Sequence, residues 1–142
     1  MQLNSATNAQ IVTAFSPVAR ASGTVTSSAI DTLGFQEMVI VTDVGVVSTN
    51  AAVKVTDCDT SGGIYADVTG AAFTTVAAAG VEYARIKLTP VTTGTGDKCD
   101  RFVKISMTTT GAGNSNIGVY VILLNYTQGT AFTANTYKFN ID

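Results

Sequence analysis

Hydrophobic and polar residues alternate along two short segments of the chain, 82–88 and 101–107. Successive side chains of a β-strand point to opposite faces, so this period of two predicts two half-buried strands. The apolar residues that would share the buried faces are Ala84, Ile86 and Leu88 in the first segment and Val103, Ile105 and Met107 in the second.

Three further segments favour strands. Residues 35–42 and 51–56 are rich in β-branched residues, and residues 117–126 are apolar on both faces. A strand that is apolar on both faces must be covered twice, which predicts either a central strand or a strand at an interface. The segment Val76–Ala79 is the one helix candidate, and Gly80 interrupts it before the next strand.

The residue types agree with a β fold. The chain holds 26 Val and Ile residues and 23 Thr residues but five Leu residues. Glycines gather at 62–63, 94–96 and 111–113, where turns between strands would fall. We therefore predict an all-β domain, an antiparallel β-sandwich or jelly roll of about nine short strands, with at most one short helix.

The 142 residues match the size of one domain, and we predict a single β-sandwich domain over 1–142. Its two ends differ from the middle. Residues 1–10 are polar and lack periodicity, which is typical of an N-terminal arm. Residues 127–142 interleave aromatic residues with Thr and Asn, which predicts either a C-terminal arm or a closing strand.

Charge and hydropathy exclude several classes of partner. The formal net charge is -2 and charged residues make up 13% of the chain, whereas a general nucleic-acid binder is basic. The longest apolar stretch, Ile117–Leu124, is far shorter than the roughly 20 residues of a membrane helix. The N-terminus resembles no secretory peptide. We expect no nucleic-acid partner, no membrane partner, and synthesis in a cytoplasm.

Catalytic chemistry is sparse in this sequence. It contains no histidine, so a Ser-His-Asp or Cys-His arrangement within one chain is excluded. Phosphate-binding and dinucleotide-binding glycine motifs are also missing. A pair of carboxylates could still hydrolyse a glycoside, but the ten acidic residues are scattered. We predict no enzyme activity, no catalytic residues and no cofactor.

One loop has the spacing of metal ligands. Asp57, Asp59 and Ser61 occupy positions 1, 3 and 5 of a calcium-type loop, and Gly62 stands at position 6. The bidentate glutamate expected at position 12 is replaced by Val68. A polar turn between two strands uses the same residue types, and we favour that interpretation over a calcium site.

The two cysteines, Cys58 and Cys99, both stand beside acidic residues near the ends of predicted strands. A disulfide between them is a candidate if those strands are neighbours. A reducing cytosol would keep both as thiols, which is the interpretation we favour. Neighbouring carboxylates raise the pKa of a thiol, which argues against a reactive nucleophile.

The polar faces of the two alternating strands carry aromatic and basic side chains. These residues, Tyr83, Arg85, Lys87, Phe102 and Lys104, would form one patch if the two strands pair. A solvated sheet face is the first interpretation and a docking surface for a protein partner is the second. Stacking of single-stranded nucleic acid is a distant third.

Low charge and an apolar strand also predict self-association. We expect a homo-oligomer, a dimer or trimer, because a small domain has little material to cover a strand that is apolar on both faces. The predicted interface comprises Tyr120, Ile122 and Leu124 on that strand and Phe132, Tyr137 and Phe139 in the C-terminal segment.

The run Ala52–Val55, the turn 57–63 and the segment Ile64–Ala71 resemble a hairpin of short β proteins from the virions of tailed bacteriophages. The segments 83–88 and 101–105 resemble the strands that follow it, and the resemblance covers about residues 35 to 126. Tyr65 stands where Trp is frequent, and the cysteines are additional. The resemblance implies a capsid decoration (cement) protein, an oligomeric β-sandwich or jelly roll on the virion surface that binds the major capsid protein.

Three functions are therefore open from the sequence. A structural virion protein is favoured by composition and by the resemblance. The alternative is a receptor- or carbohydrate-binding module of a phage fibre or tail, which the same fold could carry. A small enzyme is disfavoured because its chemistry is missing.

Overall fold

The computed structural model describes residues 9–76, 79–88, 100–124 and 139–141. These residues form ten strands, and none of the described residues is helical. The strands are β1 (Ala9–Arg20), β2 (Gly23–Thr26), β3 (Ile30–Asp31), β4 (Glu37–Val46), β5 (Asn50–Cys58), β6 (Ala66–Val76), β7 (Gly80–Lys87), β8 (Phe102–Thr110), β9 (Ser115–Leu124) and β10 (Phe139–Ile141). The prediction of an all-β domain with about nine strands is confirmed.

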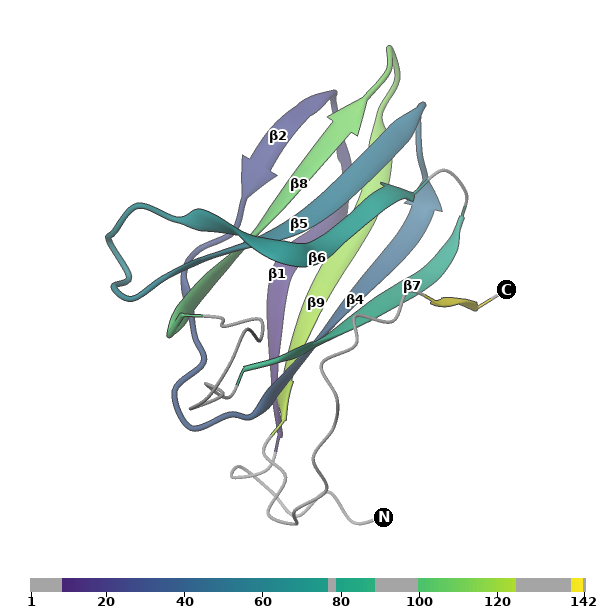
Figure 1. Ribbon diagram of the computed structural model, residues 1–142. Coiled ribbons are helices and arrows are strands. Elements are labelled where there is room, and N and C mark those ends of the chain that lie inside the picture. The colour runs from purple at the N-terminus through teal and green to yellow at the C-terminus, as the bar shows by residue number, and fades with distance from the viewer. Residues whose placement is uncertain (1–8, 77–78, 89–99, 125–138, 142) are drawn as a thin grey trace.

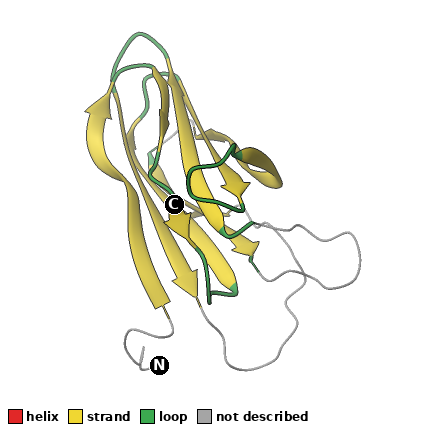
Figure 2. Ribbon diagram, turned by 90° about the vertical axis from the view of Figure 1, so that its left-hand side faces the viewer, coloured by secondary structure: helices red, strands yellow, loops and turns green. Residues whose placement is uncertain are grey.

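The strands form two antiparallel sheets that lie face to face as a β-sandwich. Sheet A has the order β1-β9-β4-β7-β10, and sheet B has the order β2-β8-β5-β6 with β3 also paired to β8. Figure 1 shows sheet B in front of sheet A, and Figure 2 shows the same layers from the side. The fold therefore has two inner faces, which form the core, and two outer faces.

The pairing of the eight longer strands follows one rule. The first strand pairs with the last (β1 with β9), the second with the seventh (β2 with β8), the third with the sixth (β4 with β7) and the fourth with the fifth (β5 with β6). The chain is thus one long antiparallel hairpin wound around a core. Each turn of the winding places one strand pair in sheet A and the next in sheet B.

The core lies between the sheets and is built by the period-two segments. The predicted inward residues Ala84, Ile86 and Leu88 are all buried, and so are Val103, Ile105 and Met107. Strand β9 contributes four fully buried side chains, Ile117, Val119, Val121 and Leu123. Of the two interpretations of this doubly apolar strand, the central one is confirmed, because β9 pairs with β1 on one side and β4 on the other.

The edges of sheet A are formed by the two ends of the described chain. Strand β1 is one edge, and its pairing with β9 shifts register on both sides of Phe15. Pro17 lies in the second of these irregularities, and proline is tolerated on an edge strand because it has no N–H to donate. Ala9 and Gln10 belong to β1, so the predicted arm 1–10 is wrong for these two residues, and 1–8 lie outside the described residues.

The last described residues form a closing strand. Phe139–Ile141 pairs with Val81–Tyr83 of β7 at the other edge of sheet A, beside the right-hand strand of Figure 1. Of the two alternatives for the C-terminal segment, a closing strand applies to these three residues. The helix candidate Val76–Ala79 begins at the last residue of β6, and its residues 77–78 lie outside the described part.

Candidate docking face

The outer face of sheet A is covered by apolar side chains that lie in rows across the strands. One row is Thr13, Tyr120, Val41 and Tyr83, and the next is Ile11, Ile122, Val39 and Arg85. A third row contains Ala9, Leu124 and Glu37. Most of these side chains are half-buried, while Ile11 is 71% exposed. Outer faces of antiparallel sheets are normally polar, so this face is unusual.

A glycine helps to keep this face flat. Gly118 lies on the same side of β9 as Tyr120, and a Cβ atom at Gly118 would lie 3.3 Å from the Tyr120 ring and 3.3 Å from Cβ of Pro17. The Tyr120 ring and Pro17 can therefore lie close to the β9 backbone only because residue 118 has no side chain. The aromatic ring is pressed against the sheet instead of standing away from it.

Charge on the face is largely cancelled within it. The Arg85 guanidinium donates through Nε to Oε1 of Glu37, which is buried. The two residues lie on adjacent strands, β7 and β4, and the ion pair offsets the charge of each. Asp43 is exposed at the end of the face, in the row of Gly118 and Val81.

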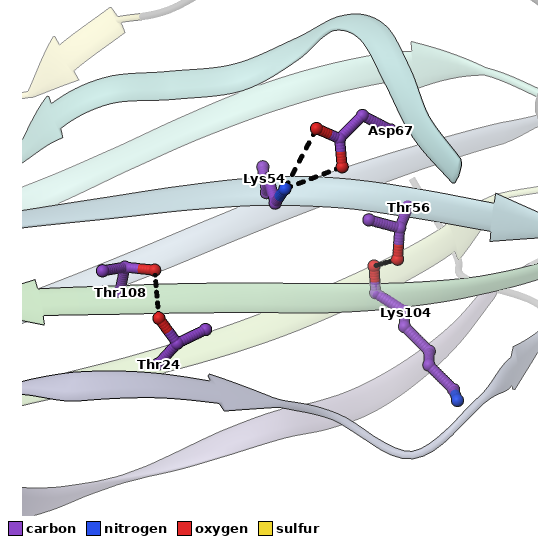
Figure 3. A network of polar contacts seen from close by, with 6 residues as sticks. All are labelled: Thr24, Lys54, Thr56, Asp67, Lys104 and Thr108. Carbon is purple, nitrogen blue, oxygen red and sulfur yellow. Dashed lines mark hydrogen bonds and ion pairs between the residues drawn. The ribbon is translucent and has the colours of Figure 1, made fainter. Parts of the chain in front are cut away.

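The outer face of sheet B is different, because Thr, Ser and Lys residues make up most of its centre, beside Ala52 and Phe102. Thr24 and Thr108 are register partners whose hydroxyl oxygens lie 2.8 Å apart. Lys54 Nζ donates to both carboxylate oxygens of Asp67, at 2.7 and 3.0 Å. Thr56 donates to the backbone carbonyl of Lys104, at 3.4 Å. Figure 3 shows these contacts side by side on β2, β8, β5 and β6.

Two contacts of basic side chains, those of Arg101 and Lys104, lie at one end of sheet B. Arg101 donates to both carboxylate oxygens of Asp31, from Nε at 2.9 Å and from the terminal nitrogen at 2.7 Å. These bonds and the backbone N–H of Leu33 lower the pKa of Asp31 to about 2. Lys104 Nζ lies 4.1 Å from the centre of the Tyr65 ring. The two basic side chains at this end of the sheet therefore each have a partner within the protein.

The predicted aromatic and basic patch is wrong as a single surface. Tyr83 and Arg85 lie on β7 in sheet A, whereas Phe102 and Lys104 lie on β8 in sheet B. The two strands do not pair, so their outward side chains point away from opposite faces of the sandwich. Lys87 belongs to β7, and its side chain lies outside the described residues.

The structure instead joins parts of two predicted sets. Tyr83 and Arg85, from the predicted protein-binding set, share the outer face of sheet A with Tyr120, Ile122 and Leu124 from the predicted oligomer interface. Phe139 pairs with Tyr83 through the backbone of β10. Phe132 and Tyr137 lie outside the described residues.

Sequence reasoning missed three residues of this face, Ile11, Val39 and Val41. A signal was present for the latter two. Residues 38–41 form an uninterrupted apolar run, which has the same pattern that marked β9 as covered on both faces. Ile11 gives no comparable signal, because β1 alternates poorly and shifts register within its length.

The candidate calcium loop has the contacts of a turn. Asp57 is buried and accepts the backbone N–H of Asp100 at 2.9 Å, while Asp59 is exposed. The Ser61 carbonyl accepts the Tyr65 hydroxyl at 3.0 Å. Within the described ranges, no three His, Cys, Asp or Glu side chains are grouped so that they could hold a metal ion. These contacts favour the polar turn.

The candidate disulfide is described for one partner alone. Cys58, at the end of β5, forms no disulfide within the described residues and is half-buried, with Sγ 3.9 Å from the Thr60 hydroxyl. Cys99 lies outside the described residues, but its neighbour Asp100 is bonded to Asp57, the residue before Cys58. The favoured interpretation, two free thiols, and the alternative, a disulfide between them, therefore both stay predictions.

The hairpin between β5 and β6 extends beyond the sandwich at the left of Figure 1. Ile64 lies in the loop of this hairpin and is 95% exposed. It is a single apolar side chain beside the polar contacts of Tyr65, so it does not continue the outer face of sheet A.

No protein-family model, curated protein or solved structure matches this chain. In the described part of the chain, no helix is long and apolar enough to cross a membrane.

Proposed function

We propose that this protein is a structural virion protein, a capsid decoration (cement) protein that docks on the major capsid protein through the outer face of sheet A. The observation that carries the proposal is the group of half-buried Tyr120, Val41 and Ile122 side chains on a sheet face that no described element covers. A contiguous apolar patch on an outer face supports an interaction site there.

The strand pairing supports the same proposal. A sheet order in which the first strand pairs with the last, and so on inward to the fourth and fifth, supports the jelly-roll alternative of the predicted fold. Jelly rolls occur in viral capsid domains and in lectins. The fold alone does not choose between these, because one fold hosts many functions. The surface therefore carries more weight than the topology.

The composition of the face predicts how it binds. Its central rows are apolar or aromatic, and its Arg85 is already bonded to Glu37. Affinity would come from removing apolar surface from water, about 25 cal/mol per Å², and a lattice of repeated sites lets modest contacts add up. We therefore expect binding to fall about tenfold between low and physiological salt, whereas binding through many phosphates would fall by roughly a thousandfold.

Two exposed isoleucines allow a matched test. Ile11→Lys places a charge on the outer face of sheet A, and Ile64→Lys places the same charge at the β5–β6 hairpin. Both residues are well exposed, so neither change should affect folding. We expect Ile11→Lys to weaken co-sedimentation with mature capsids of the same virus at least about tenfold and Ile64→Lys to leave it unchanged.

Capsid binding that is equally strong in both variants would contradict the docking face. No capsid binding at any salt, together with binding to host cells or glycans that Ile11→Lys abolishes, would replace this proposal with the receptor- or carbohydrate-binding module. Tight single-stranded DNA binding with a steep salt dependence would overturn both.

A further inference from the structure

Strand β1 forms one edge of sheet A, and its first half is regular. Residues 9–13 pair one for one with residues 124–120 of β9, and the first register shift comes after Thr13. On the other side of residues 9–13, no described strand pairs with β1. The backbone N–H and C=O groups on that side form an edge to which another strand can add.

The other edges of the two sheets, as far as the structure describes them, carry features that hinder the addition of a strand. Strands β2, β3 and β10 have only four, two and three residues. Strand β6 is long, but it carries Asp67, and its ladder with β5 is interrupted around Gly70, which has a φ of +77°. The part of β7 beyond the β10 ladder carries the charged residues Arg85 and Lys87. Residues 9–13 contain no charge, proline or bulge, so they form the least protected edge.

We infer that two copies of this chain pair through residues 9–13 of β1, antiparallel about a two-fold axis, so that their A sheets become one continuous sheet. The regular segment is centred on Ile11, so this pairing places Ile11 opposite Ile11 of the second copy and Gln10 opposite Val12. A second copy fits this edge because a two-fold contact uses the same surface on both partners, and here it brings no like charges together.

The exposure of Ile11 supports this pairing. Ile11 is 71% exposed, the highest value among the large apolar side chains on the outer face of sheet A. Residues directly opposite in an antiparallel pair lie on the same face, with Cβ atoms about 4.5–5.5 Å apart. The two Ile11 side chains would therefore cover each other. The row of Ile11, Ile122 and Val39 would also continue into the same row of the second copy.

This inference goes beyond the proposed function, because it concerns the contact between copies and holds whatever the outer face of sheet A binds. Ile11 belongs to both surfaces, and the Ile122→Lys variant separates them. Ile122 lies in the same row as Ile11 but on β9, which is a central strand. Ile122→Lys should therefore weaken co-sedimentation with capsids and leave the pairing of the two copies unchanged.

Charges at the two-fold axis test the pairing. Ile11→Lys alone and Ile11→Glu alone each place like charges opposite one another, whereas an equal mixture of the two variants places opposite charges there. By analytical ultracentrifugation, we expect the wild type to form a species of twice 14.6 kDa in a share that rises with protein concentration. Each variant alone should dimerise at least about tenfold more weakly, and the mixture should recover most of the loss. Ile64→Lys, on the β5–β6 hairpin, is the control and should match the wild type.

A cysteine at the axis tests the register. In a full-length background with Cys58→Ser and Cys99→Ser, Ile11→Cys should link two copies on oxidation, because residue 11 faces itself. Thr13→Cys is the matched control, since Thr13 is exposed on the same face but would lie about 14 Å from Thr13 of the second copy.

Three results would each overturn the inference. The first is a wild-type monomer at every concentration, and the second is a dimer that both charged variants leave intact. The third is Ile11→Cys that links no more than Thr13→Cys. None of these would change the outcome of the capsid test with Ile122→Lys, and a failure of capsid binding would leave the dimer measurements unaffected.

Discussion

The outer faces of the two sheets are built on strands of the same kind, but their side chains differ. On sheet A, Tyr120 and Val41 lie between Thr13 and Tyr83 in a row that is mostly apolar. On sheet B, Thr24 faces Thr108 and Lys54 is bonded to Asp67. The inner faces of both sheets are mostly apolar, as a shared core requires.

This difference shows which residues the fold itself requires. A sandwich needs apolar inner faces on both sheets, and it makes no demand on the outer faces beyond strand propensity. The threonines of sheet B satisfy that propensity and remain compatible with water. The valines and tyrosines of sheet A satisfy it equally but place half-buried apolar side chains on an outer face, which is the surface that the proposed docking would cover.

The largest expected effect is the difference in stability between an inward and an outward substitution on one strand, β9. Val121 is fully buried, whereas its neighbour Ile122 lies on the outer face of sheet A. We expect Val121→Asp to cost more than about 4 kcal/mol, because an uncompensated carboxylate enters the core. Ile122→Lys should cost about 1 kcal/mol and weaken docking. Urea denaturation measures both, and similar losses would show that Ile122 serves the core.

A second prediction concerns the flatness of the outer face. Gly118→Val should lower stability by about 1–3 kcal/mol, because its side chain would displace the Tyr120 ring and Pro17. Gly62→Val is the control, since no atom lies within 4 Å of a Cβ atom there. The melting temperature and the capsid co-sedimentation should both decrease in Gly118→Val, and neither should change in the control. An unchanged melting temperature in Gly118→Val would contradict the close approach.

A third prediction compares two buried threonines, one from each sheet. Thr42 Oγ1 in sheet A is buried without a hydrogen-bond partner, whereas Thr109 Oγ1 in sheet B donates to the Ala21 carbonyl at 3.0 Å. We expect Thr42→Val to raise the free energy of unfolding by about 1 kcal/mol and Thr109→Val to lower it by about 1 kcal/mol. Changes of the same sign in the two variants would contradict this assignment.

The smallest expected effect is the loss of stability at acidic pH. The bonds from Arg101 and from the backbone of Leu33 lower the pKa of Asp31 to about 2 from its ordinary value of 3.8. A carboxyl group whose pKa is lower in the folded state stabilises the protein above the unfolded pKa. This contribution is lost as the pH falls from about 4 towards 2.

Asp31→Asn should remove that part of the acid dependence. The loss at neutral pH should be below about 1 kcal/mol, because both partners are nearly half exposed. The Asp67→Asn variant is a control for the other exposed pair of sheet B, with Lys54. Unfolding curves at several pH values, with NMR titration of Asp31, measure the effect, and a pKa near 4 in the folded protein would contradict the Arg101 contact.

The sequence by itself determined the fold class and the inward faces. Alternation in residues 82–88 and 101–107 placed Ala84, Ile86, Val103 and Ile105 in the core, because burial of every second side chain is a local property of a strand. Residues 117–126 do not alternate but are apolar on both faces, which left two interpretations, and the structure shows β9 as a central strand.

Only the tertiary structure decided which outward residues share a surface. Tyr83 and Lys104 were expected together, yet β7 and β8 belong to different sheets, and Tyr83 lies instead with Tyr120. Strand order depends on pairing between segments far apart in the chain, and alternation within one strand carries no information about its neighbours. The physical reason is that periodicity sets the face on which a side chain lies, whereas long-range pairing sets which faces join.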